Sequence, residues 1–152
     1  MLKYLFRGLC SFVVLIYLAS SAIAQMAQPI AGPANGAFPA HYLSAANTNS
    51  TNVAAVKTNI YEIVAVNTTA TLYFLKLYDK ATAPTCGTDT PVMTLPIPFG
   101  TSSSGGGVSV PIPVGAQFIN GFGFCITGGI ADNDSTSAAT GIAVNFLYQI
   151  KQ

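Results

Sequence analysis

The fold is decided by residues 71–79, whose sequence is TLYFLKLYD. Alternate side chains divide into Tyr73, Leu75 and Leu77 on one face and Leu72, Phe74, Lys76 and Tyr78 on the other. This two-residue period is typical of a β-strand, and here both faces are apolar. Such a strand lies at the centre of a covered sheet or packs against a second subunit, and the sequence leaves both alternatives open.

Further segments of the chain show the same period and are separated by turn residues. They are residues 60–67, 92–98, 108–114, 121–127 and 141–150. No amphipathic helical pattern occurs between them. Seven or eight short antiparallel strands predict an all-β domain, a single β-sandwich with jelly-roll-like connections.

The alternation also predicts which side chains face the core. Along residues 60–67 it groups Ile60, Val64 and Val66 with Glu62, and Tyr61, Ile63 and Ala65 on the other face. It places Val108, Val110, Ile112 and Val114 on one face of their segment, and Phe122, Phe124 and Ile126 on one face of the next. In the last segment it places inward Ile142, Val144, Phe146, Tyr148 and Ile150. Pro111 and Pro113 lack the backbone N–H that a ladder requires, which predicts an edge strand. Gly121 and Gly123 indicate close packing against the backbone of residues 121–127.

The N-terminus has the pattern of a secretory signal peptide. Lys3 and Arg7 precede an apolar run from Leu9 to Leu18, and small residues lead to a cleavage site between Ala24 and Gln25. The run is shorter than the roughly 20 residues that cross a bilayer, which disfavours the alternative of an uncleaved anchor. We therefore expect a signal peptide at residues 1–24, an extended leader at 25–41 and the β-sandwich at 42–152. The protein is then exported, to the periplasm or the medium, and meets the membrane only transiently.

Charged residues make up only 7% of the chain, and 51% of residues are hydrophobic. Arg7 is the only arginine, so the expected mature chain has none. Phosphate binding depends on clustered Lys and Arg, so nucleic acid is not an expected ligand. A surface so poor in charge favours a homo-oligomer or docking on a larger assembly or cell surface.

Cys86 and Cys125 remain after export, in a compartment where disulfides form. We expect them to pair. The alternative is two separate buried thiols that pack as small hydrophobic groups.

No motif for catalysis, nucleotide or cofactor binding is found. His41 is the single histidine, no G-x-S-x-G sequence occurs, and no Lys-Ser/Thr follows Gly105 to Gly107. Asp132, Asp134 and Asp89 are weak calcium candidates, because their oxygens lie in loops, although the spacing fails the EF-hand pattern. Asp, Asn and Ser in such loops also bond their own backbone, which is the competing interpretation.

A resemblance to a known group of proteins covers most of the mature chain. Residues 77–92 (LYDKATAPTCGTDTPV), 121–127 (GFGFCIT), 131–134 (ADND) and 144–148 (VNFLY) resemble small β-sandwich proteins of tailed-phage and prophage structural regions. The resemblance implies a non-enzymatic, virion-associated or surface-decorating role. The export signal departs from that pattern, because virion subunits assemble in the cytoplasm.

These observations predict an exported, non-enzymatic structural or interaction module that self-associates or docks on a surface. The strand faces bearing Tyr73, Phe74 and Tyr78 are the candidate interaction surface. The alternative is a secreted glycan- or calcium-binding module, with Tyr73 or Tyr78 as a stacking platform or the loop of Asp132 and Asp134 as the ion site.

Overall fold

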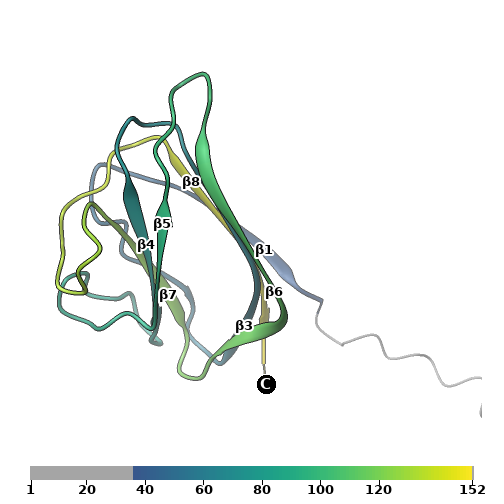
Figure 1. Cartoon of the computed structure of the whole chain (residues 1–152). Helices are drawn as coiled ribbons and strands as arrows, with labels where there is room; N and C mark the ends of the chain where they lie inside the picture. Colours follow the sequence, from purple (N-terminus) through teal and green to yellow (C-terminus); the bar gives the residue numbers. More distant parts are fainter. Residues whose placement is uncertain (1–35, 152) are drawn as a thin grey trace, which may run out of the picture. The chain divides into compact units, whose positions relative to one another are not determined.

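The computed structural model describes residues 36–151, which form two four-stranded antiparallel sheets packed face to face (Figure 1). Sheet A contains, in spatial order, β1 (Phe38–Leu43), β8 (Ile142–Ile150), β3 (Thr58–Asn67) and β6 (Gly106–Phe118). Sheet B contains β2 (Thr51–Ala54), β7 (Phe122–Thr127), β4 (Tyr73–Asp79) and β5 (Met93–Ile97). Residues 36–151 contain no helix long and apolar enough to cross a membrane.

The strands pair in a nested order. β1 pairs with β8, β2 with β7, β3 with β6 and β4 with β5, all antiparallel. The first strand therefore lies beside the last, and the innermost pair is joined through the β4–β5 connection. This nesting is the jelly-roll topology, and it confirms the predicted fold class.

One hydrophobic core lies between the sheets. Sheet B contributes Leu75 and Phe122, both without exposed surface, and sheet A contributes Phe146. The rings of Phe122 and Phe146 meet edge-on, with centroids 4.9 Å apart, a favourable aromatic geometry. The inward positions predicted for Ile142, Val144 and Phe146 of β8 are confirmed. In β4 and β7 the core takes one of the two faces that the alternation separates, namely Tyr73, Leu75 and Leu77, and Phe122, Phe124 and Ile126.

β3 contains a bulge that the alternation of residues 60–67 did not reveal. Ile60 lies opposite Tyr148 of β8, whereas Glu62 lies opposite the adjacent Leu147, so β3 has one extra residue at Tyr61. Ile60 and Ile63 therefore both face the core and are fully buried. The predicted grouping of Ile60 with Glu62, Val64 and Val66 was wrong for this reason.

Sheet A also begins earlier than predicted. β1 starts at Phe38, so residues 38–41 belong to the sandwich and not to the leader expected at 25–41. Ala40 and Tyr42 pack against the core, and pairing with β8 satisfies the backbone of this segment. The predicted signal peptide and its cleavage site at Ala24 and Gln25 lie in residues 1–35, which are outside the described part of the chain.

β6 is an edge strand, as its prolines predicted. Val108, Val110 and Ile112 pack against the core. Val114 does not, because the register of β6 shifts between Pro111 and Ala116 and carries Val114 outward, where it is 90% exposed.

Candidate functional site

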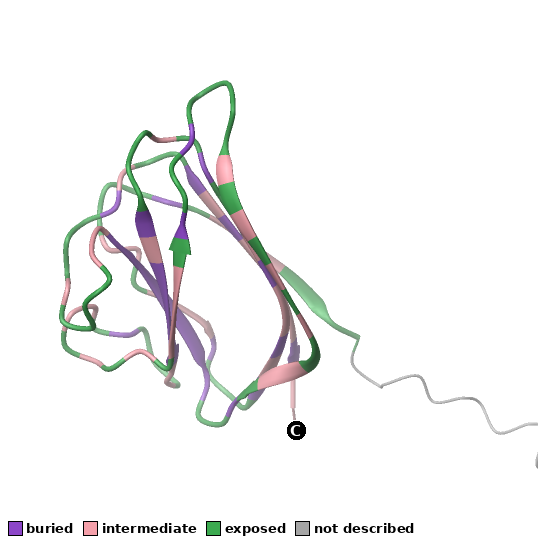
Figure 2. Cartoon of the chain, viewed as in Figure 1, coloured by how far each residue is buried: buried purple, intermediate pink, exposed green. Residues whose placement is uncertain are grey.

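The two outer faces of the sandwich differ. The outer face of sheet B is covered by two loops of the same chain, residues 80–92 and residues 128–137, on the side of β4 and β7 away from sheet A (Figure 1). We call them the first and second covering loops. Lys76 and Tyr78 point to this outer face yet are buried, and Figure 2 shows β7 as buried along its whole length. The covered-sheet alternative is therefore correct for β4.

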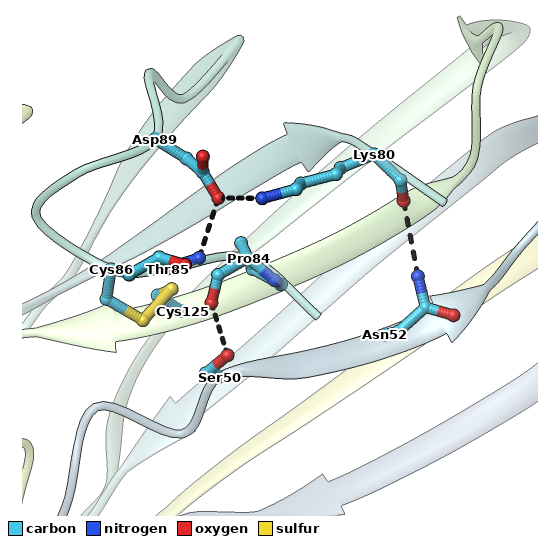
Figure 3. A network of polar contacts seen from close by, with 8 residues as sticks. All are labelled: Ser50, Asn52, Lys80, Pro84, Thr85, Cys86, Asp89 and Cys125. Carbon is cyan, nitrogen blue, oxygen red and sulfur yellow. Dashed lines mark hydrogen bonds and ion pairs between the residues drawn. A yellow bond between two sulfur atoms is a disulfide. The ribbon is translucent and has the colours of Figure 1, made fainter. Parts of the chain in front are cut away.

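Polar bonds shape the first covering loop and attach it to β2 (Figure 3). The Lys80 ammonium and the Thr85 amide both donate to Oδ2 of Asp89, at 2.5 and 2.7 Å. The hydrogen bond from Lys80, followed by that from Thr85, holds the pKa of Asp89 below its ordinary value. Ser50 donates to the Pro84 carbonyl, and Asn52 Nδ2 donates to the Lys80 carbonyl at 3.2 Å.

A disulfide joins the same loop to the sheet. Cys86 bonds to Cys125 at the centre of β7, with the two Cα atoms 6.1 Å apart, so the predicted pairing is confirmed. Pro84 packs against Gly123, where a Cβ atom would lie 2.9 Å from the Pro84 Cδ. Glycine is needed here because the loop approaches the backbone closely, as the glycine pattern indicated.

The second covering loop is held by a buried lysine. Lys76 Nζ donates to the carbonyls of Ala131 and Asp134, at 2.5 and 3.2 Å. Burial lowers the pKa of Lys76, while the charges of Asp134 and Asp132 oppose that shift. The Asp134 carboxylate accepts hydrogen bonds from Gly129 N at 2.8 Å and from Thr136, and the bond from Thr136 is the main reason that its pKa is lowered.

The three calcium candidates do not form one site. Asp134 bonds the turn of its own loop, and Asp89 pairs with Lys80 on the other covering loop. Residues 36–151 contain no group of three or more His, Cys, Asp or Glu side chains that could hold a metal ion. At the Asp132 and Asp134 loop, the positive charge is supplied by the Lys76 ammonium.

The predicted interaction surface at Tyr73, Phe74 and Tyr78 is not exposed. Tyr73 faces the core and is 8% exposed, Tyr78 lies beneath the covering loops and is 1% exposed, and Phe74 is half-buried. The prediction failed because apolar side chains on both faces of a strand do not reveal what covers them. Neither tyrosine can act as a stacking platform for a glycan in this fold.

No loop of residues 36–151 covers the outer face of sheet A, which is the candidate interaction site and is called the open face below. Its residues alternate with the core residues of β1, β8, β3 and β6. Its cross-strand rows are Leu43, Ala143, Val66 and Gly107; His41, Asn145, Val64 and Ser109; Pro39, Leu147, Glu62 and Pro111; and Gln149, Asn59 and Gln117, with Tyr61 beside the last row. Leu43 is 73% exposed and Val66 is 38% exposed.

Glu62 is the only acidic residue of these rows, and the Lys151 ammonium donates to Gln149 Oε1 at 2.5 Å at the end of the face. The polar neighbours bond one another: His41 Nδ1 lies 2.7 Å from Asn145 Oδ1, and Tyr61 Oη donates to Gln149 Oε1 at 3.1 Å. Sequence reasoning missed this face because the bulge at Tyr61 broke the alternation that would have grouped its residues. The signal that could have found it was the polar and apolar alternation of residues 143–149, which is regular in the sequence.

No family model and no curated protein matches the chain. Among solved structures, the coat protein of tobacco streak virus aligns with a TM-score of 0.33 and 10% identity, over 81% of this chain and 91% of that chain. A structure described as the dimer of that coat protein gives a TM-score of 0.31 and 10% identity, over 82% and 92%. Scores at this level establish neither a shared family nor a shared function.

Proposed function

We propose that this protein is an exported, non-enzymatic structural module that self-associates or docks on a surface through the open face of sheet A. The observation that carries the proposal is the difference between the two outer faces. The outer face of sheet B is covered, and the disulfide of Cys86 and Cys125 fixes one cover in place. The open face presents mainly apolar and amide side chains, with one carboxylate, Glu62, in its rows and the Lys151 ammonium bonded to Gln149 at its end.

The use of charge in the fold supports an assembly role. Lys76 is buried, Lys80 pairs with Asp89, and the Asp79 carboxylate accepts hydrogen bonds from the backbone of the β6–β7 turn. Between residues 36 and 151, Lys80 with Asp89 is the single ion pair. Most charges therefore hold loops and turns together, and few remain to keep the surface hydrated. A surface of this kind is stabilised by contact with another body.

Export is supported by the disulfide and by the N-terminal sequence. A disulfide is stable in the periplasm or outside the cell, whereas the cytosol keeps thiols reduced. N-terminal sequencing of the protein recovered from outside the cytoplasm should begin at Gln25. Recovery of functional protein that retains Met1 would contradict export by a cleaved signal.

The absence of catalysis is part of the proposal. His41 is exposed on β1, and its Nδ1 bonds the amide oxygen of Asn145. The polar and sulfur groups around the first covering loop serve its attachment: Ser50, before β2, donates to a backbone carbonyl, and the thiols of Cys86 and Cys125 are joined. The polar contacts therefore serve the fold, and the open face is the part left for function.

The test is a comparison of two surface variants of the mature protein. Leu147→Lys places a charge at the centre of the open face, and Thr88→Lys places the same charge on the exposed part of the first covering loop. We expect the wild type and Thr88→Lys either to self-associate in light scattering or to sediment with the surface of the producing cells, and Leu147→Lys to lose that behaviour. A wild type that stays monomeric and binds no cell surface would overturn the proposal.

A further inference from the structure

We infer that the open face of sheet A packs against the open face of a second copy of this chain, with Glu62 as the charge that keeps the association weak. The inference rests on the proposed function and names its partner. It is argued from the charge of the face, its area and the position of Glu62.

The charge of the open face argues against a charged partner. A cationic surface would find a single carboxylate, Glu62, and an anionic surface such as nucleic acid or a phospholipid membrane would find a single ammonium, that of Lys151, which donates to Gln149 at the end of the face. The favoured partner is therefore an uncharged surface of apolar and amide groups. The same face of a second copy has this chemistry, and a two-fold axis makes such a contact self-complementary.

The side chains of the open face differ in size, which allows two copies to approach closely. Ala143 and Gly107 lie in the same row as Leu43 and Val66, so small and large side chains alternate across the sheet. Sheets that pack face to face interdigitate in this manner at about 10 Å separation. A larger side chain of one copy can then fill the space above a small residue of the other.

The area of the face sets the strength of the contact. Four strands spaced by about 4.8 Å, over a length of about 23 Å, give a projected area of roughly 450 Å². Stable complexes bury about 800 Å² of accessible surface on each partner. The open face is therefore small for a permanent complex, and we expect a dimer whose population depends on concentration.

Glu62 lies on a central strand, between Leu147 of β8 and Pro111 of β6. If the two-fold axis runs along the strands, β3 of one copy lies over β8 of the other, and the carboxylate meets Leu147. If the axis runs across the strands, β3 lies over β3, and the carboxylate meets the region of Val64 or a second Glu62. In both arrangements the carboxylate faces Leu147, Val64 or a second Glu62, none of which is a cation, and this opposes association.

Sedimentation equilibrium of the mature protein over a concentration series tests the inference. We expect Glu62→Gln to raise the association constant by about tenfold or more, because it removes the buried charge and keeps the side-chain shape. Leu147→Lys should lower it by about tenfold or more, and Thr88→Lys should stay within about twofold of wild type. If Leu147→Lys fails to fold by circular dichroism, Ser109→Lys on the same face, where Ser109 is exposed, replaces it.

The outcomes separate this inference from the proposed function. If neither Glu62→Gln nor Leu147→Lys changes the association constant, the face-to-face contact is overturned, while self-association itself stands. A monomer at all concentrations, in the wild type and in Glu62→Gln, would also overturn it. If that monomer binds the cell surface and Leu147→Lys abolishes the binding, docking through the open face stands without a second copy.

Discussion

Removal of the disulfide should destabilise the domain by a predictable amount. Cys86 and Cys125 are separated by 39 positions in the chain. In the chain-entropy model a loop of this length, when closed, lowers the entropy of the unfolded chain by the equivalent of roughly 4 kcal/mol at 25 °C. That figure is an upper value, because strain in the native bond subtracts from it. For a domain of this size, the loss corresponds to a fall in Tm of roughly 15 °C.

The assay is urea unfolding of the double variant Cys86→Ala/Cys125→Ala beside the wild type with and without reductant. Alanine avoids a buried hydroxyl at Cys125, which has no exposed surface. The single variant Cys86→Ala is the matched control for the packing of the first thiol, since it loses the bond but keeps Cys125. We expect the double variant and the reduced wild type to unfold at similar, lower urea concentrations. A free energy of unfolding within about 1 kcal/mol of the oxidised wild type would refute the reasoning.

Three other perturbations address the covered side of the fold. Gly123→Ala should lower the free energy of unfolding by about 1–3 kcal/mol in urea titration, because the new Cβ would lie 2.9 Å from both Pro84 Cδ and Thr51 O; an unchanged midpoint would show that the first covering loop does not press on β7. Burial raises the pKa of Tyr78 from 10.0 to about 12, so the unfolded state loses its proton first and stability falls as the pH rises between these values. Tyr78→Phe should reduce this loss of stability at alkaline pH and leave the free energy of unfolding at pH 7 unchanged, since the buried Oη has no bonding partner among the described residues. A marked fall in Tm at pH 7 in thermal melts would contradict this. The pKa of Asp134 is lowered from 3.8 in the folded state. The carboxylate therefore adds to the free energy of unfolding above that pH, and this addition is lost as the pH falls through the lowered value. Asp134→Asn should therefore be less stable at pH 7 and show a flatter acid transition than wild type, and parallel acid curves would count against its role in the second covering loop.

The sequence identified the strands whose side chains alternate without interruption. Residues 71–79 and 121–127 were predicted as strands with the correct division into two faces, because their large apolar residues recur at every second position. A β-sandwich also followed, because seven or eight short strands occur with no helical pattern between them, whereas the nested order of pairing was not predicted from the residues. The pairing of Cys86 with Cys125 could be predicted because the expected export leaves these two thiols and no other in the mature chain.

What the sequence could not provide depends on contacts between distant segments. β2 was not among the predicted strands, because Thr51 and Asn52 have no strand pattern of their own and are held by pairing with β7. The bulge at Tyr61 exists because β3 must fit two neighbours, β6 and β8, at once. Burial of Tyr78 depends on loops whose path is set by a disulfide and by the Lys76 ammonium, and neither leaves a periodic signal in the sequence.

Hydroxyl-radical footprinting at low and high protein concentration would distinguish the two outer faces directly. On the open face the probes are Leu43, which is 73% exposed, and Leu147. On the covering loops they are Val92 and Ile130, which are 60% and 66% exposed. We expect labelling of Leu43 and Leu147 to fall as concentration rises, while that of Val92 and Ile130 stays constant. Protection of Val92 and Ile130, with Leu43 and Leu147 labelled equally at both concentrations, would contradict assembly through sheet A.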